Sequence, residues 1–168
     1  YRSILSEEIS DIHSGETVMG IIQNGKYIVN EVVLHCAALN ENQIEQFSKW
    51  SAAQIMAEID VWHKARKFKG FGYHGLFMPS GEFLQGRPYT TQGAHVVERN
   101  RGSIGFLMIE SQEILKMGKF ENFFTEMQRQ AVRQKIKELP GIKWVTGHND
   151  YANKLCPGFK VKDEDWLP

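Results

Sequence analysis

Apolar residues are arranged along the chain in two patterns, one typical of helices and one typical of strands. In the segment Ser51–Lys67 they are spaced by 3, 4 and 3 residues, which predicts an amphipathic helix with one apolar side. The segment Thr125–Leu139 predicts a second helix, which Pro140-Gly141 would end. Both segments begin with Ser or Thr followed three residues later by Gln, the pattern of a capping box. A shorter helix is expected over Ile4–Ile12.

Strands are predicted where apolar residues form short runs. The run SIGFLMI, residues 103–109, is apolar on both faces and predicts a central strand covered on both sides. The segments 17–23 and 26–34 flank Asn24-Gly25, a pair that favours a type I′ turn, so we expect a β-hairpin. Because strands and helices alternate, we expect an α/β (α+β) fold, a single domain with a central mixed β-sheet flanked by helices. Further strands are expected over residues 71–78, 82–86 and 142–146.

Length, charge and cysteine content narrow the possible classes of protein. A chain of 168 residues fits one domain. Lys plus Arg and Asp plus Glu each number 20, so the net charge is zero, and a nucleic-acid partner is not expected. No run of 18 apolar residues occurs, so membrane insertion is not expected either. Two cysteines are too few for a disulfide scaffold.

Three residues of metal-binding types follow predicted strands. His35 closes the strand in VVLHC, His148 follows the strand in WVTGH, and Cys156 lies eight residues later in NKLCPGF. Loops at strand ends present side chains to a shared cleft. Two imidazoles and one thiolate form a three-ligand zinc site that leaves a position for water, and zinc lowers the pKa of that water toward about 7. The spacing alone also fits a simpler interpretation, in which His35 is a hydrogen-bonded histidine at a strand end.

Other candidate residues admit a structural interpretation as well. Tyr73 and His74 interrupt the apolar run FGYHGLF, and because neighbours on a strand face opposite ways, only one of them can face the cleft. Tyr73 could instead be a packing residue, and Lys154 either directs a cation at the site or is a solvated lysine. His95, in the glycine-bearing segment GAHVVERN, could be a surface residue.

The second cysteine and the helical histidine are interpreted as structural. Cys36 follows His35 directly on a strand, so its side chain should point to the opposite face and into the core. If His35 and Cys156 share a zinc ion, the same geometry argues against a disulfide between Cys36 and Cys156. His63 flanks the apolar side of its helix and is expected at the helix surface.

Five motifs in order resemble one enzyme family. They are VVLHCAA, WHKARKFKGFGYH, GRP, GAHVVERNRGSIGF and GHNDYANKLCPGF, and they run from about residue 28 to residue 159. This series resembles the zinc-dependent N-acetylmuramoyl-L-alanine amidases of type 2. It is most similar to the phage lysozymes, or endolysins, of that family and more distantly similar to the peptidoglycan recognition proteins of animals. Leu107 stands where muropeptide-recycling members carry glutamate, which favours the phage type.

The resemblance implies roles for the positions that match these motifs, and it divides the chain into an N-terminal extension, residues 1–26, and a zinc amidase domain, residues 27–168. The implied roles are His35, His148 and Cys156 as ligands of one Zn²⁺ per chain, Tyr73 and Lys154 as catalytic residues, and His95, His74 and Asn100 as substrate contacts.

The implied activity is hydrolysis of the amide between N-acetylmuramic acid and L-alanine of the peptidoglycan stem peptide by zinc-activated water. A phage or prophage endolysin of this kind would be bacteriolytic and antimicrobial. It would be a monomer, made in the cytoplasm, and would act on the cell wall, in the periplasm or outside the cell. Its partner would be peptidoglycan.

Two other classes of function stay open. The chain could be a peptidoglycan-binding module without activity, although such modules have usually lost the zinc cysteine. It could also be a thiol hydrolase with Cys156 as nucleophile and a histidine as base. A purely structural zinc is disfavoured, because such sites usually have four protein ligands.

Overall fold

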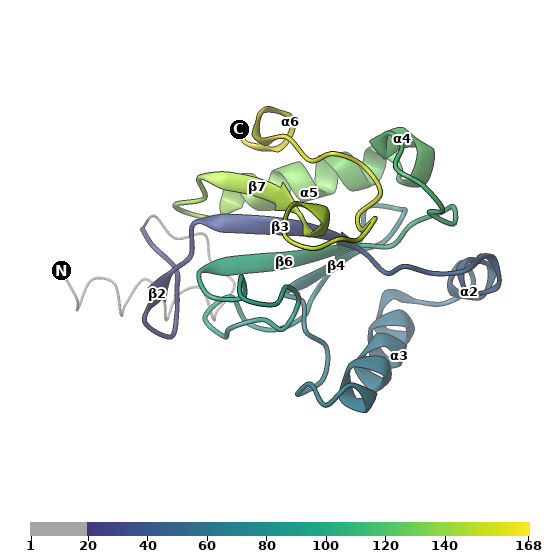
Figure 1. Cartoon of the computed structure of the whole chain (residues 1–168), viewed down its shortest axis with the longest axis horizontal. Coiled ribbons are helices and arrows are strands. Elements are labelled where there is room, and N and C mark those ends of the chain that lie inside the picture. The colour runs from purple at the N-terminus through teal and green to yellow at the C-terminus, as the bar shows by residue number, and fades with distance from the viewer. Residues whose placement is uncertain (1–19) are drawn as a thin grey trace.

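The computed structural model describes residues 20–168 and contains a five-stranded sheet (Figure 1). Its strands are β3 (Glu31–Cys36), β4 (Gly75–Phe77), β5 (Phe83–Gln85), β6 (Ser103–Met108) and β7 (Trp144–Gly147), in the order β5-β4-β6-β3-β7. β6 pairs in parallel with β3 and β4, and β3 pairs in parallel with β7. Only β5 runs antiparallel within this sheet. The sheet is therefore mixed, and β6 is its central strand, as the run 103–109 predicts.

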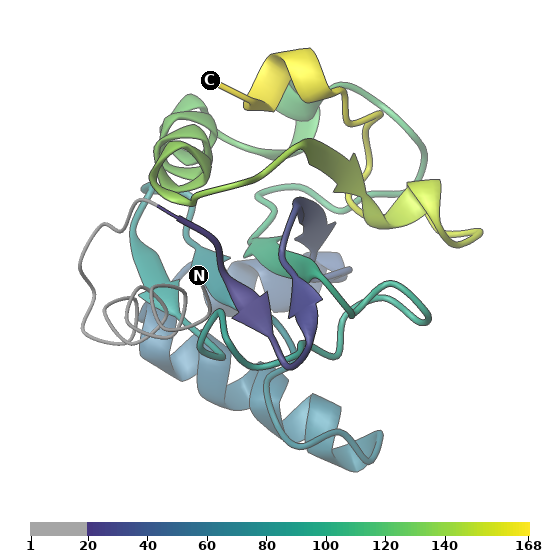
Figure 2. The same ribbon diagram turned by 90° about the vertical axis from the view of Figure 1, so that its left-hand side faces the viewer.

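Helices cover both faces of the sheet, in line with the predicted α/β class. α3 (Ala52–Ala65) and the short α2 (Glu41–Phe47) pack on one face with Leu76 and Leu107. α5 (Glu126–Glu138) packs on the other face, with the short helices α4 (Phe120–Phe123) and α6 (Asp163–Trp166) beside it. In Figure 2 the strands lie between α3 below and α5 and α6 above.

The two long helices begin where their capping patterns place them. The Ser51 hydroxyl accepts from the Gln54 amide at 3.2 Å, and the Gln54 side chain accepts from the Ser51 amide at 2.8 Å. Thr125 and Gln128 form the same reciprocal pair at the start of α5. Each pair satisfies amide groups that a helix start leaves unpaired. Both predicted helices are confirmed, within two residues at their ends.

The predicted hairpin forms, but its turn lies one residue later than expected. β1 (Gln23–Asn24) pairs with β2 (Tyr27–Ile28), and Asn24 lies opposite Tyr27, so the turn residues are Gly25-Lys26. The buried Asn24 side chain accepts from the Gly102 amide at 3.1 Å and donates to the Ser103 carbonyl at 3.3 Å. These bonds hold Asn24 in the strand, and Gly25 takes the positive φ of 65°.

Other elements differ from the predicted ones because the surrounding packing decides them. The predicted strand over 26–34 divides into β2 and β3, and the one over 71–78 shortens to β4. α2, α4 and α6 have no predicted counterpart. The expected helix over 4–12 lies outside the described residues.

The boundary between an extension and a catalytic domain at residue 26 stays a prediction. Ile22 is fully buried in the core on the α5 face, so residues just before the boundary pack with the rest of the fold. Within residues 20–168, no helix is both long and apolar enough to cross a membrane.

Candidate metal centre

His35, His148 and Cys156 come together at one edge of the sheet. β3 ends at Cys36, just after His35, and β7 ends at Gly147, just before His148. Because β3 and β7 are parallel neighbours, their carboxyl ends lie at the same edge. One potential ligand atom from each of the three residues lies within 4.8 Å of the others. Among residues 20–168 these three form a group able to hold a metal ion.

Contacts around Cys156 favour its thiolate. The pKa of this thiol lies well below its usual range, first because of a hydrogen bond with the Cys36 thiol and then because of one with His148, against the effect of burial. The Cys36 amide also donates to the Cys156 sulfur at 3.2 Å. A thiolate beside two imidazoles, with His35 Nδ1 3.8 Å from the sulfur, is a donor set that zinc prefers. The residues present therefore fit a zinc ion.

Cys36 occupies two environments at once. Its side chain is buried in the core on the α5 face, as strand alternation predicts, and both cysteines are free thiols. It nevertheless touches Cys156, and the pKa of the Cys36 thiol is raised, first by that hydrogen bond and then by burial. The alternation of side chains along a strand places Cys36 and His35 on opposite faces. It does not predict the contact with Cys156, because that residue lies in a loop that returns to the end of β3.

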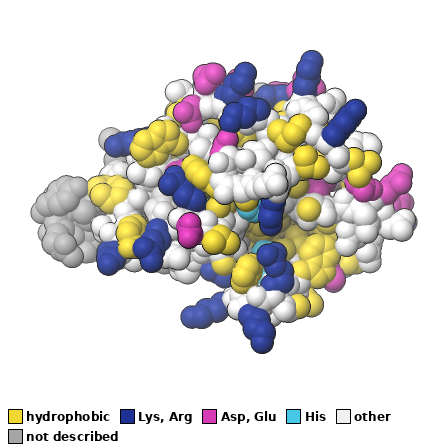
Figure 3. Space-filling model, in the orientation of Figure 1, with side chains coloured by type: hydrophobic (Ala, Val, Ile, Leu, Met, Phe, Trp, Pro, Cys, Tyr) yellow, Lys and Arg dark blue, Asp and Glu magenta, His cyan; other side chains and the backbone are white. Residues whose placement is uncertain are grey.

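A cavity of about 410 Å³ opens beside the three residues. Figure 3 shows histidine side chains in this hollow, with basic and hydrophobic side chains around them. Its charged wall residues are Arg66 and Lys154, and none of the described residues on the wall is acidic. The remaining wall is largely apolar and aromatic, including Ile59, Trp62, Phe68, Tyr73, Val97 and Leu107.

Tyr73 and Lys154 both reach the cavity wall next to the histidines. The Tyr73 ring packs edge-on against His35 with 4.9 Å between ring centroids. Burial raises the pKa of Tyr73, so its hydroxyl keeps its proton at neutral pH. Lys154 is exposed at the rim, and its charge contributes to a lowered pKa of His35, whose first cause is burial. The structure thus brings both predicted catalytic residues to the metal group.

His95 and Asn100 line the cavity, but the protein already engages their polar atoms. His95 Nδ1 lies 2.9 Å from His35 Nε2, and His95 Nε2 lies 3.2 Å from the Ser103 hydroxyl. The Asn100 side-chain oxygen accepts from the amides of His95 and Val96, at 2.8 and 3.0 Å. A role in substrate contact stays a prediction for both residues.

His74 does not line the cavity. Its side chain is fully buried; Nδ1 accepts from the Gly105 amide at 3.0 Å, and Nε2 donates to the Thr91 carbonyl at 2.8 Å. Burial lowers the pKa of His74 to about 4. Of the adjacent pair it is therefore Tyr73 that faces the cleft, and the geometry does not favour the predicted substrate contact for His74.

His63 lies at the cavity wall, so the surface position predicted for it is wrong. It is buried, its Nδ1 accepts from the Gly72 amide at 2.9 Å, and its ring contacts Tyr73. The signal was present in the sequence, because His63 follows Ile59 by four residues and continues the apolar side of α3. The neighbouring wall residues Trp62, Arg66 and Phe68 were not predicted as site residues either.

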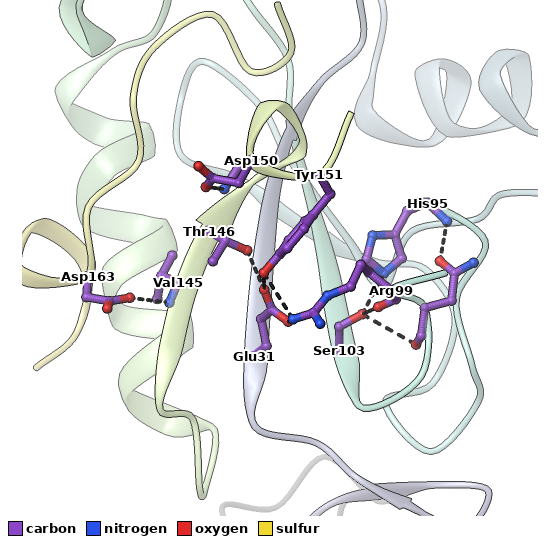
Figure 4. Close-up of polar contacts among 11 residues, drawn as sticks. Glu31, His95, Arg99, Ser103, Val145, Thr146, Asp150, Tyr151 and Asp163 are labelled. Atoms are coloured by element: carbon purple, nitrogen blue, oxygen red, sulfur yellow. Dashed lines mark hydrogen bonds and ion pairs between the residues drawn. The ribbon is translucent and has the colours of Figure 1, made fainter. Parts of the chain in front are cut away.

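A buried carboxylate at the other end of β3 ties the two site loops together (Figure 4). Glu31 is 4% exposed; it accepts from Arg99 at 2.8 Å, from Thr146 at 2.6 Å and from the Tyr151 hydroxyl. The Arg99 guanidinium also lies 4.4 Å from the centre of the Tyr151 ring. Arg99 belongs to the loop of His95 and Tyr151 to the loop between His148 and Cys156, so one carboxylate holds both. No pattern in the sequence predicted this cluster.

The loop that carries His148 has a second anchor. The Asp150 side chain, labelled in Figure 4, accepts from the Gly147 amide at 2.9 Å. It also pairs with Lys160 at 2.6 Å. Tyr151 and Ala152 donate their amides back to the His148 carbonyl. His148 is therefore held in a 3₁₀ turn, His148–Asp150, directly after β7.

Comparison with known proteins places the fold. No family model matches the chain, and no curated protein matches it in sequence. Among solved structures, it is similar to N-acetylmuramoyl-L-alanine amidase LysC from Clostridium intestinale URNW, with a TM-score of 0.62 and 22% identity over 88% of this chain and 87% of that one. It is also similar to bumblebee PGRP-SA, with a TM-score of 0.63 and 18% identity over 89% and 90% of the two chains.

A third similar structure contains a ligand. It is peptidoglycan recognition protein-LE in complex with tracheal cytotoxin, a monomeric diaminopimelic acid-type peptidoglycan. The TM-score is 0.61, and the identity is 18% over 83% of this chain and 78% of that one. The chain thus has the fold shared by these amidases and peptidoglycan recognition proteins, as the motifs predict.

Proposed function

We propose that this protein is a zinc-dependent N-acetylmuramoyl-L-alanine amidase that cleaves the amide between N-acetylmuramic acid and L-alanine of the stem peptide. The observation that carries the proposal is the meeting of His35, His148 and the thiolate-favouring Cys156 beside a cavity. The shared fold supports the substrate class. As proposed, the protein is a monomer of phage or prophage type that acts on the cell wall.

The cavity wall suits an anionic peptide. Arg66 and Lys154 lie on it, with no acidic residue among the described wall residues, although the whole chain carries no net charge. A peptidoglycan stem peptide carries carboxylates, which these cations would attract. The aromatic surfaces of Trp62 and Phe68 give its apolar parts a place to pack.

In the proposed reaction, His35, His148 and Cys156 hold one zinc ion. Bound zinc supplies a Lewis acid for the scissile carbonyl and an acidified water at neutral pH. Lys154 directs its ammonium group at the negative charge that develops on the carbonyl oxygen. Tyr73, whose raised pKa keeps the hydroxyl protonated, would relay to the departing amine nitrogen the proton that the attacking water gives up, so that Tyr73 is protonated again at the end of the step. The apolar wall limits the water that reaches these groups.

A second candidate function, recognition of peptidoglycan without cleavage, is favoured by the likeness to peptidoglycan recognition proteins. The two functions differ in their products. The purified chain, loaded with zinc, is incubated with purified peptidoglycan, and the soluble fragments are identified by mass spectrometry. An amidase releases stem peptides with a free L-alanine amino group and leaves the glycan strands intact.

Three results would contradict the proposal. Binding to peptidoglycan without any product would support a recognition module. Cleavage of a glycosidic or an interpeptide bond would show a different hydrolase. Full activity after removal of metal by a chelator would favour Cys156 as a thiol nucleophile. The Cys156→Ser variant is the inactive reference for these digestions.

A further inference from the structure

A chain of hydrogen bonds starts at the candidate ligand His35 and continues through His95 to Ser103. His35 Nε2 lies 2.9 Å from His95 Nδ1, and His95 Nε2 lies 3.2 Å from the Ser103 hydroxyl oxygen. The Ser103 oxygen in turn lies 2.6 Å from the Arg99 carbonyl oxygen. His35, His95 and Ser103 are all buried, so water does not compete for these positions.

The last bond of this chain fixes the proton positions of all the others. A carbonyl oxygen only accepts, so at 2.6 Å the Ser103 hydroxyl must donate its proton to Arg99. Ser103 must then accept from His95, which places the His95 proton on Nε2. His95 Nδ1 is left as an acceptor and takes the proton of His35 Nε2. His35 Nδ1 consequently has a free lone pair, and this atom lies 3.8 Å from the Cys156 sulfur.

We propose that His95 is a positioning residue for the metal centre, which sets the tautomer and the ring orientation of His35 so that Nδ1 faces the metal. This inference rests on the zinc site of the proposed function. Ligand histidines are commonly held by an acceptor on their other nitrogen, and loss of such a partner typically costs about 10–100-fold in metal affinity. In this role both ring nitrogens of His95 are bonded within the protein, to His35 and to Ser103, and no contact with substrate is required.

The surroundings of His95 are built to keep its ring in place. A Cβ added at Gly105 would lie 2.6 Å from the His95 ring, so only glycine on β6 leaves room for it. The Asn100 oxygen holds the backbone amide of His95 at 2.8 Å. Arg99, which supplies the terminal carbonyl, is fixed through its side chain to Glu31 on the same strand as His35. The chain of bonds therefore begins and ends on β3.

Zinc affinity tests the proposal with a matched set of variants. Metal-free full-length protein is titrated with zinc against a chromogenic chelator. His95→Leu keeps apolar bulk but removes the acceptor, and we expect zinc binding about 10–100-fold weaker than in the unmodified chain. His95→Asn restores most of this loss, because its Oδ1, like His Nδ1, is bonded to Cγ and can accept from His35 Nε2. His74→Leu removes another fully buried imidazole, bonded only to the backbone, and leaves zinc affinity within about twofold of the unmodified chain.

Nitrogen-15 spectra of the zinc-loaded, unmodified chain test the same assignment without relying on a variant that folds. We expect His35 to be metal-bound through Nδ1 with a proton on Nε2, and His95 to carry its proton on Nε2. A proton on His95 Nδ1, or unchanged zinc affinity in a folded His95→Leu variant, would overturn the inference. If the unmodified chain binds no zinc at all, the proposed function fails first, and that result is distinct from either of these.

Discussion

The two ends of β3 both bury polar side chains, but the surrounding protein treats them differently. At its beginning, the two Glu31 oxygens accept from three side chains, so the carboxylate is fully paired. At its end, His35 Nδ1, His148 and Cys156 turn ligand atoms toward one another. A satisfied cluster stabilises the fold, whereas lone pairs that converge on one point are suited to a cation. The beginning of β3 is therefore part of the scaffold, and its end is the candidate metal centre.

The largest expected effect is at the cysteine that faces the cavity. Cys156→Ser replaces a thiolate with a neutral hydroxyl, which is a far poorer zinc ligand, and we expect zinc affinity to fall by more than the roughly 100-fold that changes outside the ligand set can cost. Elemental analysis and a chelator competition titration measure it.

The matched control for that variant is Cys36→Ser. It removes a hydrogen bond to Cys156 but no ligand, so its loss of zinc affinity should stay within the roughly 10–100-fold that changes outside the ligand set cost. Equal loss in the two variants would show that Cys36 is itself a ligand and that the ligand set described at the end of β3 is wrong.

The next effect is on turnover rather than on metal content. Lys154→Met removes a cation while keeping most of the aliphatic bulk, and Tyr73→Phe removes only a hydroxyl. We expect each to lose at least about tenfold in kcat, since loss of one group that stabilises a developing oxyanion costs up to about 10²–10³. Both variants should keep about one zinc per chain and still bind peptidoglycan.

Rates from digestion of purified peptidoglycan, with zinc content measured on the same samples, check this expectation. Lys143→Met is the matched control, because Lys143 does not line the cavity. Unmodified turnover in Lys154→Met would make Lys154 a solvated surface lysine and remove it from the proposed reaction.

At the other end of β3 the expected effect is on stability. Glu31→Gln replaces an acceptor of three hydrogen bonds with an amide, and we expect the free energy of unfolding to fall by about 2 kcal/mol, in the range for hydrogen bonds to a charged group. Denaturant unfolding of the metal-free protein measures the change.

The control is Glu45→Gln, which breaks an exposed pair between α2 and Lys49 in the turn that follows it, and should change stability by at most about 0.5 kcal/mol. If Glu31→Gln changed the unfolding free energy as little as this control does, the buried cluster would not stabilise the fold. The two ends of β3 would then not differ in the way described above.

The smallest expected effect is a fall of about 1.4 kcal/mol in the unfolding free energy at pH 5.5, which comes from the titration of His74. Its pKa is lowered from 6.5 to about 4 by burial, so the unfolded chain takes up this proton at a higher pH than the folded chain does. The contribution is fully present above about pH 6.5 and is lost as the pH falls toward 4, by about 1.4 kcal/mol per pH unit. At pH 5.5 the unfolding free energy should therefore be lower than at pH 7.

Unfolding curves of the metal-free chain and of His74→Gln across this range isolate the contribution. As the pH falls from 6.5 to 4, the unfolding free energy of the variant should fall less steeply than that of the unmodified chain. The difference in slope is at most that of one proton, about 1.4 kcal/mol per pH unit. Identical slopes would mean that the His74 environment is open to water or to a compensating charge.

Much of the candidate site could be predicted because its residues lie at the ends of strongly patterned strands. The apolar runs before His35 and His148 predict where each strand ends, and parallel pairing then brings those ends together. The surface position predicted for His63 is wrong, although the spacing from Ile59 predicts its burial. The hydrogen bonds of Glu31 with Arg99 and Tyr151 could not be predicted. These two residues lie 68 and 120 positions away along the chain, in loops without a periodic pattern.

The sequence by itself determined the α/β class, the two capped helices, the central strand and the residue types able to bind zinc. These depend on local periodicity, on capping pairs and on the chemistry of individual side chains. Only the tertiary structure decided that Tyr73 and not His74 faces the cavity, that Cys36 touches Cys156, and that His95 turns toward His35. Such contacts depend on how loops return to a sheet edge, which is settled by packing and long-range hydrogen bonds rather than by any pattern along the chain.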